Sequence, residues 1–435
     1  MEDIALAVFE WVWFVALIAL IVVAIYLFVK LLRYCFIGRA EELAYAGRFY
    51  DKGAECFRLK PDKSQLQDIL TLAGIYLGYR VVSLGVVYAI KVIFEPGFSF
   101  SFDRILYEII KWDANHYVGI ADNWYVTEGD ARFHIVFYPL HPIVVRVFSY
   151  ICPNTKLASV LVSNISFIGC IAAMYKLLRI DFSRDTAKTA VLMLIFVPHG
   201  FFFSFGFTES LFLLWSLLFF LMLRKEQWVA AGAFGFCAAL TKNFGLVFVV
   251  PYGVWLIMLA CKNKYRVWGF IRRLLPGFLI LAGFGVYLLI NKAVTGDWFK
   301  FMEYQRDHWY NRLTCPLENV TNHLYWFFDT QDMGHRWFLW FGNISSIAVT
   351  AAIFFIGAKK QPFIYSIYTL ACLFLTMMVS WLMSGPRYLL VCFSSYITLA
   401  AVSKGRPWLK WAIIAVEIIL GMIVLLGYMG NESIM

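Results

Sequence analysis

The stretch FTESLFLLWSLLFFLMLRK, residues 207–225, places one acidic residue at the start of a long apolar run that ends in two basic residues. Such a run is typical of a helix that enters the hydrocarbon core of a bilayer. An acid at the edge of that helix costs on the order of 3 kcal/mol unless it is paired or faces water, so Glu209 is a functional candidate. The alternative is that Glu209 complements the dipole at a helix N-terminus.

The whole chain has the composition of a membrane protein. Of its 435 residues, 61% are hydrophobic, 19% aromatic and 15% charged, and the mean hydropathy is +0.70. A soluble core cannot bury this much apolar surface. The formal net charge of +10 comes from short Lys and Arg clusters between apolar runs, which indicates membrane topology rather than a nucleic-acid partner. The nine cysteines occur singly, so neither a zinc site nor a disulfide framework is indicated.

Apolar runs recur almost to the C-terminus, and they predict an all-α polytopic membrane protein with about twelve transmembrane helices. Placing the basic clusters in the cytoplasm puts both termini outside. The runs on either side of residues 241–245 are short, which predicts broken or re-entrant helices there. The predicted spans are 4–30, 69–94, 156–178, 186–205, 208–223, 228–241, 245–260, 274–294, 337–357, 362–383, 388–402 and 411–429.

The chain divides into a short N-terminal part and a main transmembrane domain. Residues 1–65 are predicted to form a retained membrane anchor and a cytoplasmic helical hairpin, and residues 66–435 the transmembrane domain. Two long outer segments, about 94–156 and 295–336, are rich in aromatic residues and histidine, which predicts amphipathic helices at the interface. All seven histidines fall on the outer side in this topology, so we expect the chemistry there.

The first outer segment contains KWDANHYVGIADNWY, residues 111–125. In a helix, Asp113, His116, Tyr117 and Ile120 share one face, and Asp122 points the opposite way. An acid beside aromatic surface near the membrane suits a general base that accepts a hydroxyl proton. The alternative is that Asp113 caps or orients an interfacial helix.

Two other short strings place a cation at a break in an apolar run. These are TKNFG at 241–245, which contains Lys242, and GPRYLL at 385–390, which contains Arg387. Unwound helix ends with a cation suit an anionic group such as a phosphate. The alternative for each cation is that it extends to the membrane interface.

The second outer segment contains GDWFKFMEYQRDHWYNRL, residues 296–313, which presents Gln305, Arg306 and His308 among aromatic residues. Arginine fits phosphate oxygens and aromatic faces suit sugar rings, although an ordinary interfacial belt has the same composition. The chain has no GxGxxG after a strand, no Walker loop and no HExxH, and neither outer segment has a D-x-D pair. Nucleotide hydrolysis and a zinc site are therefore disfavoured.

Taken in order over roughly residues 66–428, these strings resemble the PIG-V-type mannosyltransferases. The matching elements are the WD and IADxxY parts of 111–125, FxPLxP at 137–142, TES before the apolar run, the 241–245 string, GDxxxF followed by Gln-Arg, and RYLL at 387–390. His141 stands where the family has an aromatic residue, and Lys242-Asn243 stand where it has Arg-Ser.

The resemblance implies a GT-C fold whose active site faces away from the cytoplasm, and an isoprenoid-phosphate sugar as donor. No cofactor, nucleotide sugar or obligatory metal is then expected. The hypothesis is an inverting transfer of mannose or a similar hexose to a glycan or glycolipid acceptor at a membrane, the bacterial cell membrane being preferred to the endoplasmic reticulum. Asp113 matches the catalytic base. The candidate substrate- and donor-binding residues are Trp112, His116, Tyr117, Glu209, Lys242, Asn243, Gln305, Arg306, His308, Arg387 and Tyr388.

Two other classes of function compete with this hypothesis. A transporter or lipid flippase predicts inverted repeats and polar residues near the midplane, and the sequence shows no internal repeat. An assembly scaffold without catalysis predicts that Asp113→Asn has no phenotype. Sequons at Asn319 and Asn343 are the hint of a eukaryotic lumen.

Overall fold

The computed structural model describes residues 63–95, 101–358 and 360–430, together with positions 22, 26, 29, 432 and 434. The predicted anchor and hairpin of residues 1–65 therefore lie almost wholly outside the described residues. Within the described part the fold is helical, with one isolated antiparallel bridge between Leu313 and Val379.

The helical elements, including short 3-10 or π segments labelled η, are α3 Lys63–Phe94, α4 Phe102–Ile109, α5 Asp113–Asn123, η2 Asp130–Val136, α6 Leu140–Ser149, α7 Thr155–Asp181, α8 Arg184–Phe196, η3 Gly200–Phe203, α9 Glu209–Arg224, α10 Trp228–Thr241, η4 Asn243–Phe248, α11 Val249–Asn263, α12 Val267–Leu274, η5 Leu275–Gly277, α13 Phe278–Thr295, α14 Lys300–Asp307, α15 Pro316–Asp329, η6 His335–Phe341, α16 Gly342–Gly357, α17 Phe363–Met377, α18 Gly385–Leu389, α19 Ser394–Ser403 and α20 Pro407–Met429.

Six helical segments in the described part are long and apolar enough to cross a membrane: Lys63–Phe94, Thr155–Asp181, Asn243–Asn263, Val267–Thr295, His335–Gly357 and Pro407–Met429. The all-α membrane class is thus confirmed, but the predicted count of about twelve spans is not. Several predicted spans form helices that are too short. At 1.5 Å per residue, the 13 residues of α8 and the 10 of α19 do not reach across ~30 Å of hydrocarbon.

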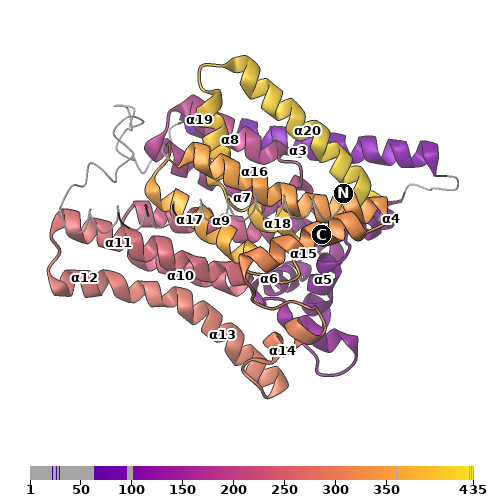
Figure 1. The fold of residues 1–435 in the computed structure, drawn as a ribbon, viewed down its shortest axis with the longest axis horizontal. Coiled ribbons are helices and arrows are strands. Elements are labelled where there is room, and N and C mark those ends of the chain that lie inside the picture. The colour runs from indigo at the N-terminus through magenta and orange to yellow at the C-terminus, as the bar shows by residue number, and fades with distance from the viewer. Residues whose placement is uncertain are drawn as a thin grey trace.

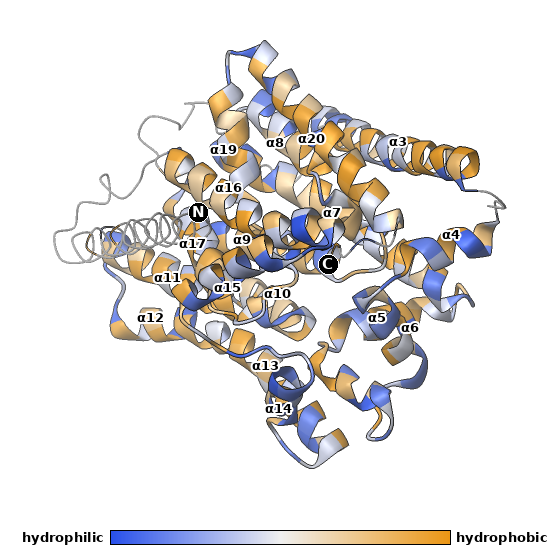
Figure 2. Cartoon of the chain, turned by 45° about the vertical axis from the view of Figure 1, so that its right-hand side comes forward, coloured by the Kyte–Doolittle hydropathy of each residue, from blue (hydrophilic) through white to orange (hydrophobic). Residues whose placement is uncertain are grey.

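The long helices and the outer segments occupy different parts of the molecule (Figure 1). The turn between α11 and α12 lies at the left end of the long axis, whereas α4 and α5 lie toward the right. Both predicted outer segments contain helices, namely α4, α5 and α6 in the first and α14 and α15 in the second. The long helices α3, α13 and α20 are mostly hydrophobic along their length, and α14 is strongly hydrophilic (Figure 2).

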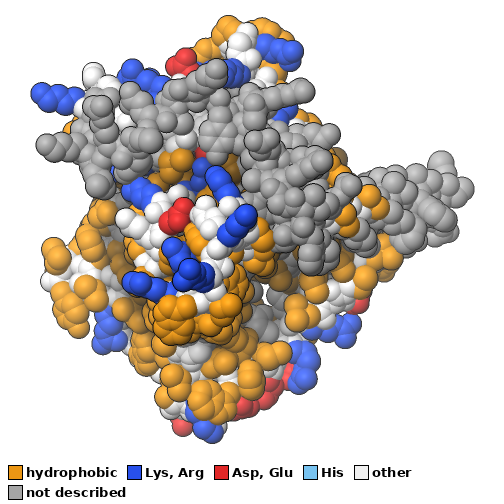
Figure 3. Space-filling model, turned by 90° about the vertical axis from the view of Figure 1, so that its left-hand side faces the viewer, with side chains coloured by type: hydrophobic (Ala, Val, Ile, Leu, Met, Phe, Trp, Pro, Cys, Tyr) orange, Lys and Arg blue, Asp and Glu red, His pale blue; other side chains and the backbone are white. Residues whose placement is uncertain are grey.

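Lys and Arg side chains gather on the face seen from the left of Figure 1, with few acidic side chains among them (Figure 3). Basic residues at the ends of membrane helices favour the cytoplasmic side. This face lies at the end of the long axis where α11 turns into α12, and α5 lies toward the other end.

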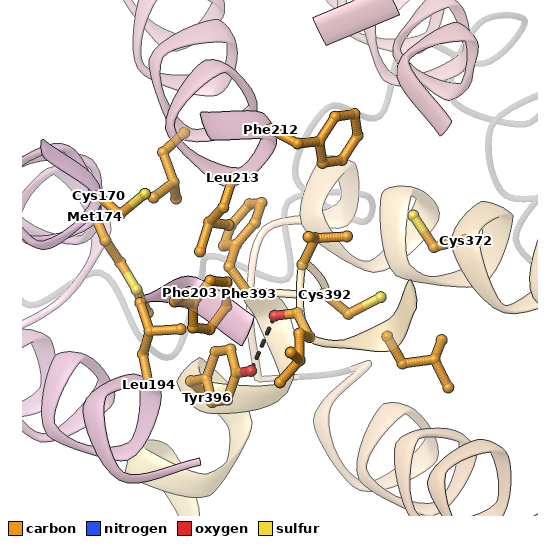
Figure 4. Packing of buried hydrophobic residues seen from close by; sticks show 14 of the residues in the cluster. Cys170, Met174, Leu194, Phe203, Phe212, Leu213, Cys372, Cys392, Phe393 and Tyr396 are labelled. Carbon is orange, nitrogen blue, oxygen red and sulfur yellow. Dashed lines mark hydrogen bonds between the residues drawn. The ribbon is translucent and has the colours of Figure 1, made fainter. Parts of the chain in front are cut away.

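One continuous apolar core holds α7, α8, α9, α17 and α19 together. In Figure 4, Cys170 and Met174 of α7 point toward Leu213 of α9, and Phe203 and Phe393 belong to the same core. The Tyr396 hydroxyl donates to the Leu390 carbonyl oxygen at 2.9 Å, which satisfies a polar group inside this core. The core fixes the starts of α9 and α18, where the charged residues described below are found.

The predicted break around residues 241–245 is confirmed. Helix α10 ends at Thr241, and the 3-10 segment η4 separates it from α11. Gly245 lies directly against the backbone of Ala238 and Ala239, so a side chain at this position would overlap main-chain atoms. The close approach folds the chain back onto the end of α10 and directs Lys242 into the protein, where it is buried.

Gly245→Ala is expected to destabilise the fold by at least about 1–3 kcal/mol, because the backbone of α10 cannot move aside as a side chain can. Gly253→Ala is the matched control, since no atom lies within 4 Å of a Cβ built on that glycine of α11. Thermal midpoints and size-exclusion profiles in detergent would check this. Equal behaviour of the two variants would contradict the proposed close approach.

Candidate active site

Helix α5 begins at Asp113, and the face predicted from its sequence is confirmed. Tyr117 and Ile120 are buried, and Asp122 is exposed on the opposite side, where its carboxylate accepts a 2.6 Å hydrogen bond from the Thr155 hydroxyl. Trp112 precedes the helix with φ +47°, a conformation that is uncommon for a bulky residue. Its ring contacts that of Tyr428 at 5.1 Å, and this packing holds the strained entry to α5.

Four charged residues from distant parts of the chain meet at the start of α5, and we call them the charged cluster: Asp113, Glu209, Lys242 and Arg387. Arg387 Nη1 donates to Asp113 Oδ2 at 2.6 Å, and its Nε donates to Glu209 Oε1 at 2.7 Å. Lys242 Nζ donates to the same Glu209 oxygen at 2.8 Å. Two acids and two bases are thus joined in one chain of contacts with no formal net charge.

Burial within the charged cluster is uneven. The side chains of Glu209, Arg387 and Lys242 are 0%, 3% and 10% exposed, whereas that of Asp113 is 23% exposed. Asp113 is therefore the most exposed of the four side chains. Because Lys242 and Arg387 are buried and paired, neither extends to the interface. Glu209 pairs with both cations, which offsets the cost of burying it, and as the first residue of α9 it also complements the helix dipole.

Aromatic rings line the cations of the charged cluster. The Arg387 guanidinium carbon lies 4.8 Å from the centre of the Phe207 ring and 5.4 Å from that of Phe202. Lys242 Nζ lies 4.8 Å from the centre of the Tyr388 ring. Aromatic faces attract cations more strongly when water is excluded, so the rings help to hold these charges inside the protein.

His141, which was not among the predicted site residues, supports the turn before Glu209. Its Nε2 lies 3.1 Å from the carbonyl oxygen of Gly206, a residue with φ +80°, and its ring contacts Tyr117 at 5.3 Å. The histidine thus fills the aromatic position of the FxPLxP string and also bonds to the chain that leads into TES. Its position within the FxPLxP string is the feature of the sequence that could have identified this role.

The two outer segments meet through rings beside Asp113. The His116 ring lies 4.6 Å from that of His134, 5.1 Å from that of Phe137 and 5.8 Å from that of Trp309. His308 stacks on Phe133 at 3.7 Å with an interplanar angle of 4°. The rings of His116, His134 and His308 therefore serve as packing groups that join η2 to α14 and the residues after it.

The other candidates of the second outer segment do not reach the charged cluster through any contact in the described structure. The exposed Arg306 pairs with its neighbour Asp307 at 2.6 Å. The backbone oxygen of the half-buried Gln305 accepts from the Asn311 N–H at 2.8 Å.

Asn243, the candidate next to Lys242, is exposed. Its side chain accepts from the Phe244 N–H at 2.9 Å, which shapes the first turn of η4.

The ring contacts predict a pH effect. Burial, followed by the proximity of His116, lowers the pKa of His134 to about 4. The unfolded chain binds this proton near pH 6.5, so stability is fully present above that value and is lost as the pH falls toward 4. The difference between the thermal midpoints at pH 7 and at pH 4.5 should therefore be smaller for His134→Phe than for the wild type. Parallel declines in the two proteins would contradict this origin of the effect.

The sequence of this chain is similar to those of several known proteins. A family model described as Mannosyltransferase (PIG-V) matches residues 96–290. GPI mannosyltransferase 2 of Yarrowia lipolytica is 24% identical over 293 residues, which cover 63% of this chain and 74% of that protein. The Schizosaccharomyces pombe protein of the same name is 30% identical over 150 residues, which cover 33% of this chain and 31% of that protein.

Among solved structures, ArnT from Cupriavidus metallidurans bound to undecaprenyl phosphate aligns with a TM-score of 0.47 and 16% identity, over 82% of this chain and 78% of that chain. The family match and the two relatives define the class of this protein, which is that of the membrane glycosyltransferases. The resemblance seen in the sequence is thus confirmed as a similarity to the PIG-V mannosyltransferases, and the chain is a glycosyltransferase enzyme.

Proposed function

We propose that this enzyme transfers mannose, or a similar hexose, from a polyprenyl- or dolichyl-phosphate donor to a lipid-linked or cell-surface glycan, and that it does so with a GT-C fold. The observation that carries the proposal is the charged cluster, in which a partly exposed aspartate touches a buried arginine. A base and a phosphate-binding cation are thereby adjacent, as displacement at an anomeric carbon requires. The names of the two yeast relatives support mannose as the sugar.

In the proposed reaction, Asp113 accepts the proton of an acceptor hydroxyl while the hydroxyl oxygen attacks the anomeric carbon. The new carbon–oxygen bond forms as the bond between that carbon and the phosphate oxygen breaks on the opposite face, which inverts the configuration. The lipid phosphate leaves with the bonding electrons. The Arg387 guanidinium donates to one carboxylate oxygen of Asp113, Oδ2, and so fixes the direction in which the side chain faces the acceptor.

Negative charge on the leaving phosphate is stabilised by Arg387 and Lys242. A guanidinium has five N–H donors, and two of them bond to Asp113 and Glu209, so further donors are available to phosphate oxygens. Because these groups are already fixed in a buried site, little reorganisation is needed as charge develops. We assign Glu209 to holding the two cations together, and Tyr117 with His116 to the wall beside the acceptor. Arg306 has no role in this proposal.

We place the active site on the extracytoplasmic side of the membrane. The support is the position of α5 at the end of the molecule away from the α11–α12 turn, together with the basic face at that other end (Figures 1 and 3). For the membrane itself we propose the bacterial cell membrane. Asn319 and Asn343 are buried, and their side-chain amides bond to backbone carbonyl oxygens, so the sequons do not indicate glycosylation.

The choice of donor tests the proposal. Purified enzyme in lipid nanodiscs would be given a membrane lipid and glycan extract together with labelled mannose carried by polyprenyl phosphate or by GDP. Label is expected in the extract from the lipid donor alone. Transfer from GDP-mannose at an equal rate would contradict the lipid-phosphate donor, and transfer from neither donor would contradict the proposed reaction.

A further inference from the structure

The segment from Met378 to Ser384 connects α17 to the short helix α18, which carries Arg387. It is not part of a longer helix, so its backbone groups must find partners elsewhere. The position of Arg387 therefore depends on the groups that bond to this segment.

The second outer segment supplies the first set of bonds. The Thr314 N–H donates to the Met378 carbonyl oxygen at 2.9 Å, and the Ser380 N–H donates to the Arg312 carbonyl oxygen at 2.9 Å. The Asn319 side-chain amide donates to the Val379 carbonyl oxygen. His323 Nε2 lies 2.7 Å from the carbonyl oxygen of Leu382. These contacts tie the segment to the start of α15 but stop before α18.

Asn343, at the start of α16, makes the last connection before Arg387. Its Nδ2 donates to the Leu382 carbonyl oxygen at 2.7 Å, and its Oδ1 accepts from the Gly385 N–H at 2.7 Å. The residue is 1% exposed, and a Cβ on Gly385 would lie 2.9 Å from the same Oδ1. One amide thus joins the two ends of the turn from Leu382 to Gly385, two residues before Arg387.

We propose that Asn343 is a positioning residue for Arg387, and through it for the leaving phosphate. The inference rests on the proposed function, because it gives Arg387 that role. Buried ion pairs and phosphate contacts need placement within about 0.5 Å, and a shift of about 1 Å in a catalytic group can cost a hundredfold in rate. A side chain at position 343 that lacks either the donor or the acceptor cannot join Leu382 to Gly385, and the turn that positions Arg387 is then no longer held.

The test compares Asn343→Leu with Asn291→Leu. Asn291 is also fully buried, and its side-chain amide likewise bonds to one backbone carbonyl oxygen and one backbone N–H. Its Nδ2 donates to the Tyr287 carbonyl oxygen at 3.0 Å, and its Oδ1 accepts from the Phe301 N–H at 3.2 Å. It joins α13 to α14 rather than to the Arg387 segment, so the two variants lose equivalent groups at different places. A loss of stability caused simply by removing a buried amide should therefore occur in both variants.

The substrate is polyprenyl-phosphate-mannose, and polyprenyl phosphate is added as the competing product. Asn343→Leu is expected to lower kcat by about a hundredfold and to weaken inhibition by polyprenyl phosphate by about tenfold or more. The KM for the acceptor should change by less than about twofold, and Asn291→Leu should leave the inhibition unchanged. Wild-type inhibition by polyprenyl phosphate in Asn343→Leu, or equal weakening in both variants, would overturn the inference.

Amide hydrogen exchange separates this inference from the proposed function, because it needs no substrate. Exchange in a peptide spanning residues 382–388 should be faster in Asn343→Leu than in the wild type, and unchanged in Asn291→Leu. Unchanged exchange in Asn343→Leu would refute the positioning role. A wild-type enzyme that transfers no sugar, while its exchange follows the expected pattern, would instead refute the proposed function alone.

Discussion

Asp113→Asn is expected to lower kcat by about a thousandfold, within the range of effects for a general base. Asparagine has nearly the same shape, and its side-chain oxygen can still accept the hydrogen bond from Arg387 Nη1. It cannot accept the hydroxyl proton. Donor binding should therefore change by less than about twofold, because the cations that would hold the phosphate remain in place. Initial rates at saturating donor, with the thermal midpoint of each preparation, measure the effect.

Asp122→Asn is the matched control for this experiment. Asp122 lies on the same helix, but it is exposed on the opposite face and bonds to Thr155. Its replacement should leave kcat within about twofold of the wild type, since surface changes away from the site are usually small. Equal losses in the two variants would show that α5 is only a structural element and would remove the base.

Arg387→Lys should lower kcat by about a hundred- to a thousandfold, the range found for the loss of a fixed donor to a developing oxyanion. Lysine preserves the positive charge of the charged cluster, but a single ammonium cannot reproduce the fork that contacts both Asp113 and Glu209. Alanine is a poorer choice because it leaves buried carboxylates uncompensated, which typically costs about 3–5 kcal/mol and would confuse folding with catalysis.

Arg224→Lys is the control for the general effect of replacing a buried arginine. Arg224 binds both carboxylate oxygens of Asp181 at 2.8 and 2.5 Å, and its side chain is 7% exposed, so lysine removes an equivalent fork. Both variants should lower the thermal midpoint, but only Arg387→Lys should lower kcat. A similar fall in kcat for both variants, in proportion to stability, would contradict the role of Arg387.

Local features of the sequence predicted much of the fold and part of the site. The helical period placed Asp113, Tyr117 and Ile120 on one face of α5 with Asp122 opposite. The apolar runs located the helices, and the short runs around Thr241 predicted the break that η4 makes. Each of these features depends on residues within about two helical turns, a range over which periodicity is informative.

Features that depend on contacts between distant residues could not be predicted in this way. No pattern shows that Arg387 pairs with Asp113, which lies 274 positions earlier. The predicted number of about twelve spans is not confirmed, because apolar composition does not distinguish a crossing helix from a short buried one. Arg306 matched the family pattern but pairs with Asp307 at the surface. Asn343 appeared in the sequence only as part of a sequon, although its amide holds a turn.

The most direct test of the central claim is to measure, side by side, the transfer of labelled mannose from polyprenyl-phosphate-mannose by the wild type, Asp113→Asn and Asp122→Asn, all purified and reconstituted in the same way. We predict transfer by the wild type and Asp122→Asn and almost none by Asp113→Asn. Transfer by Asp113→Asn at the wild-type rate, or by none of the three proteins, would contradict the claim.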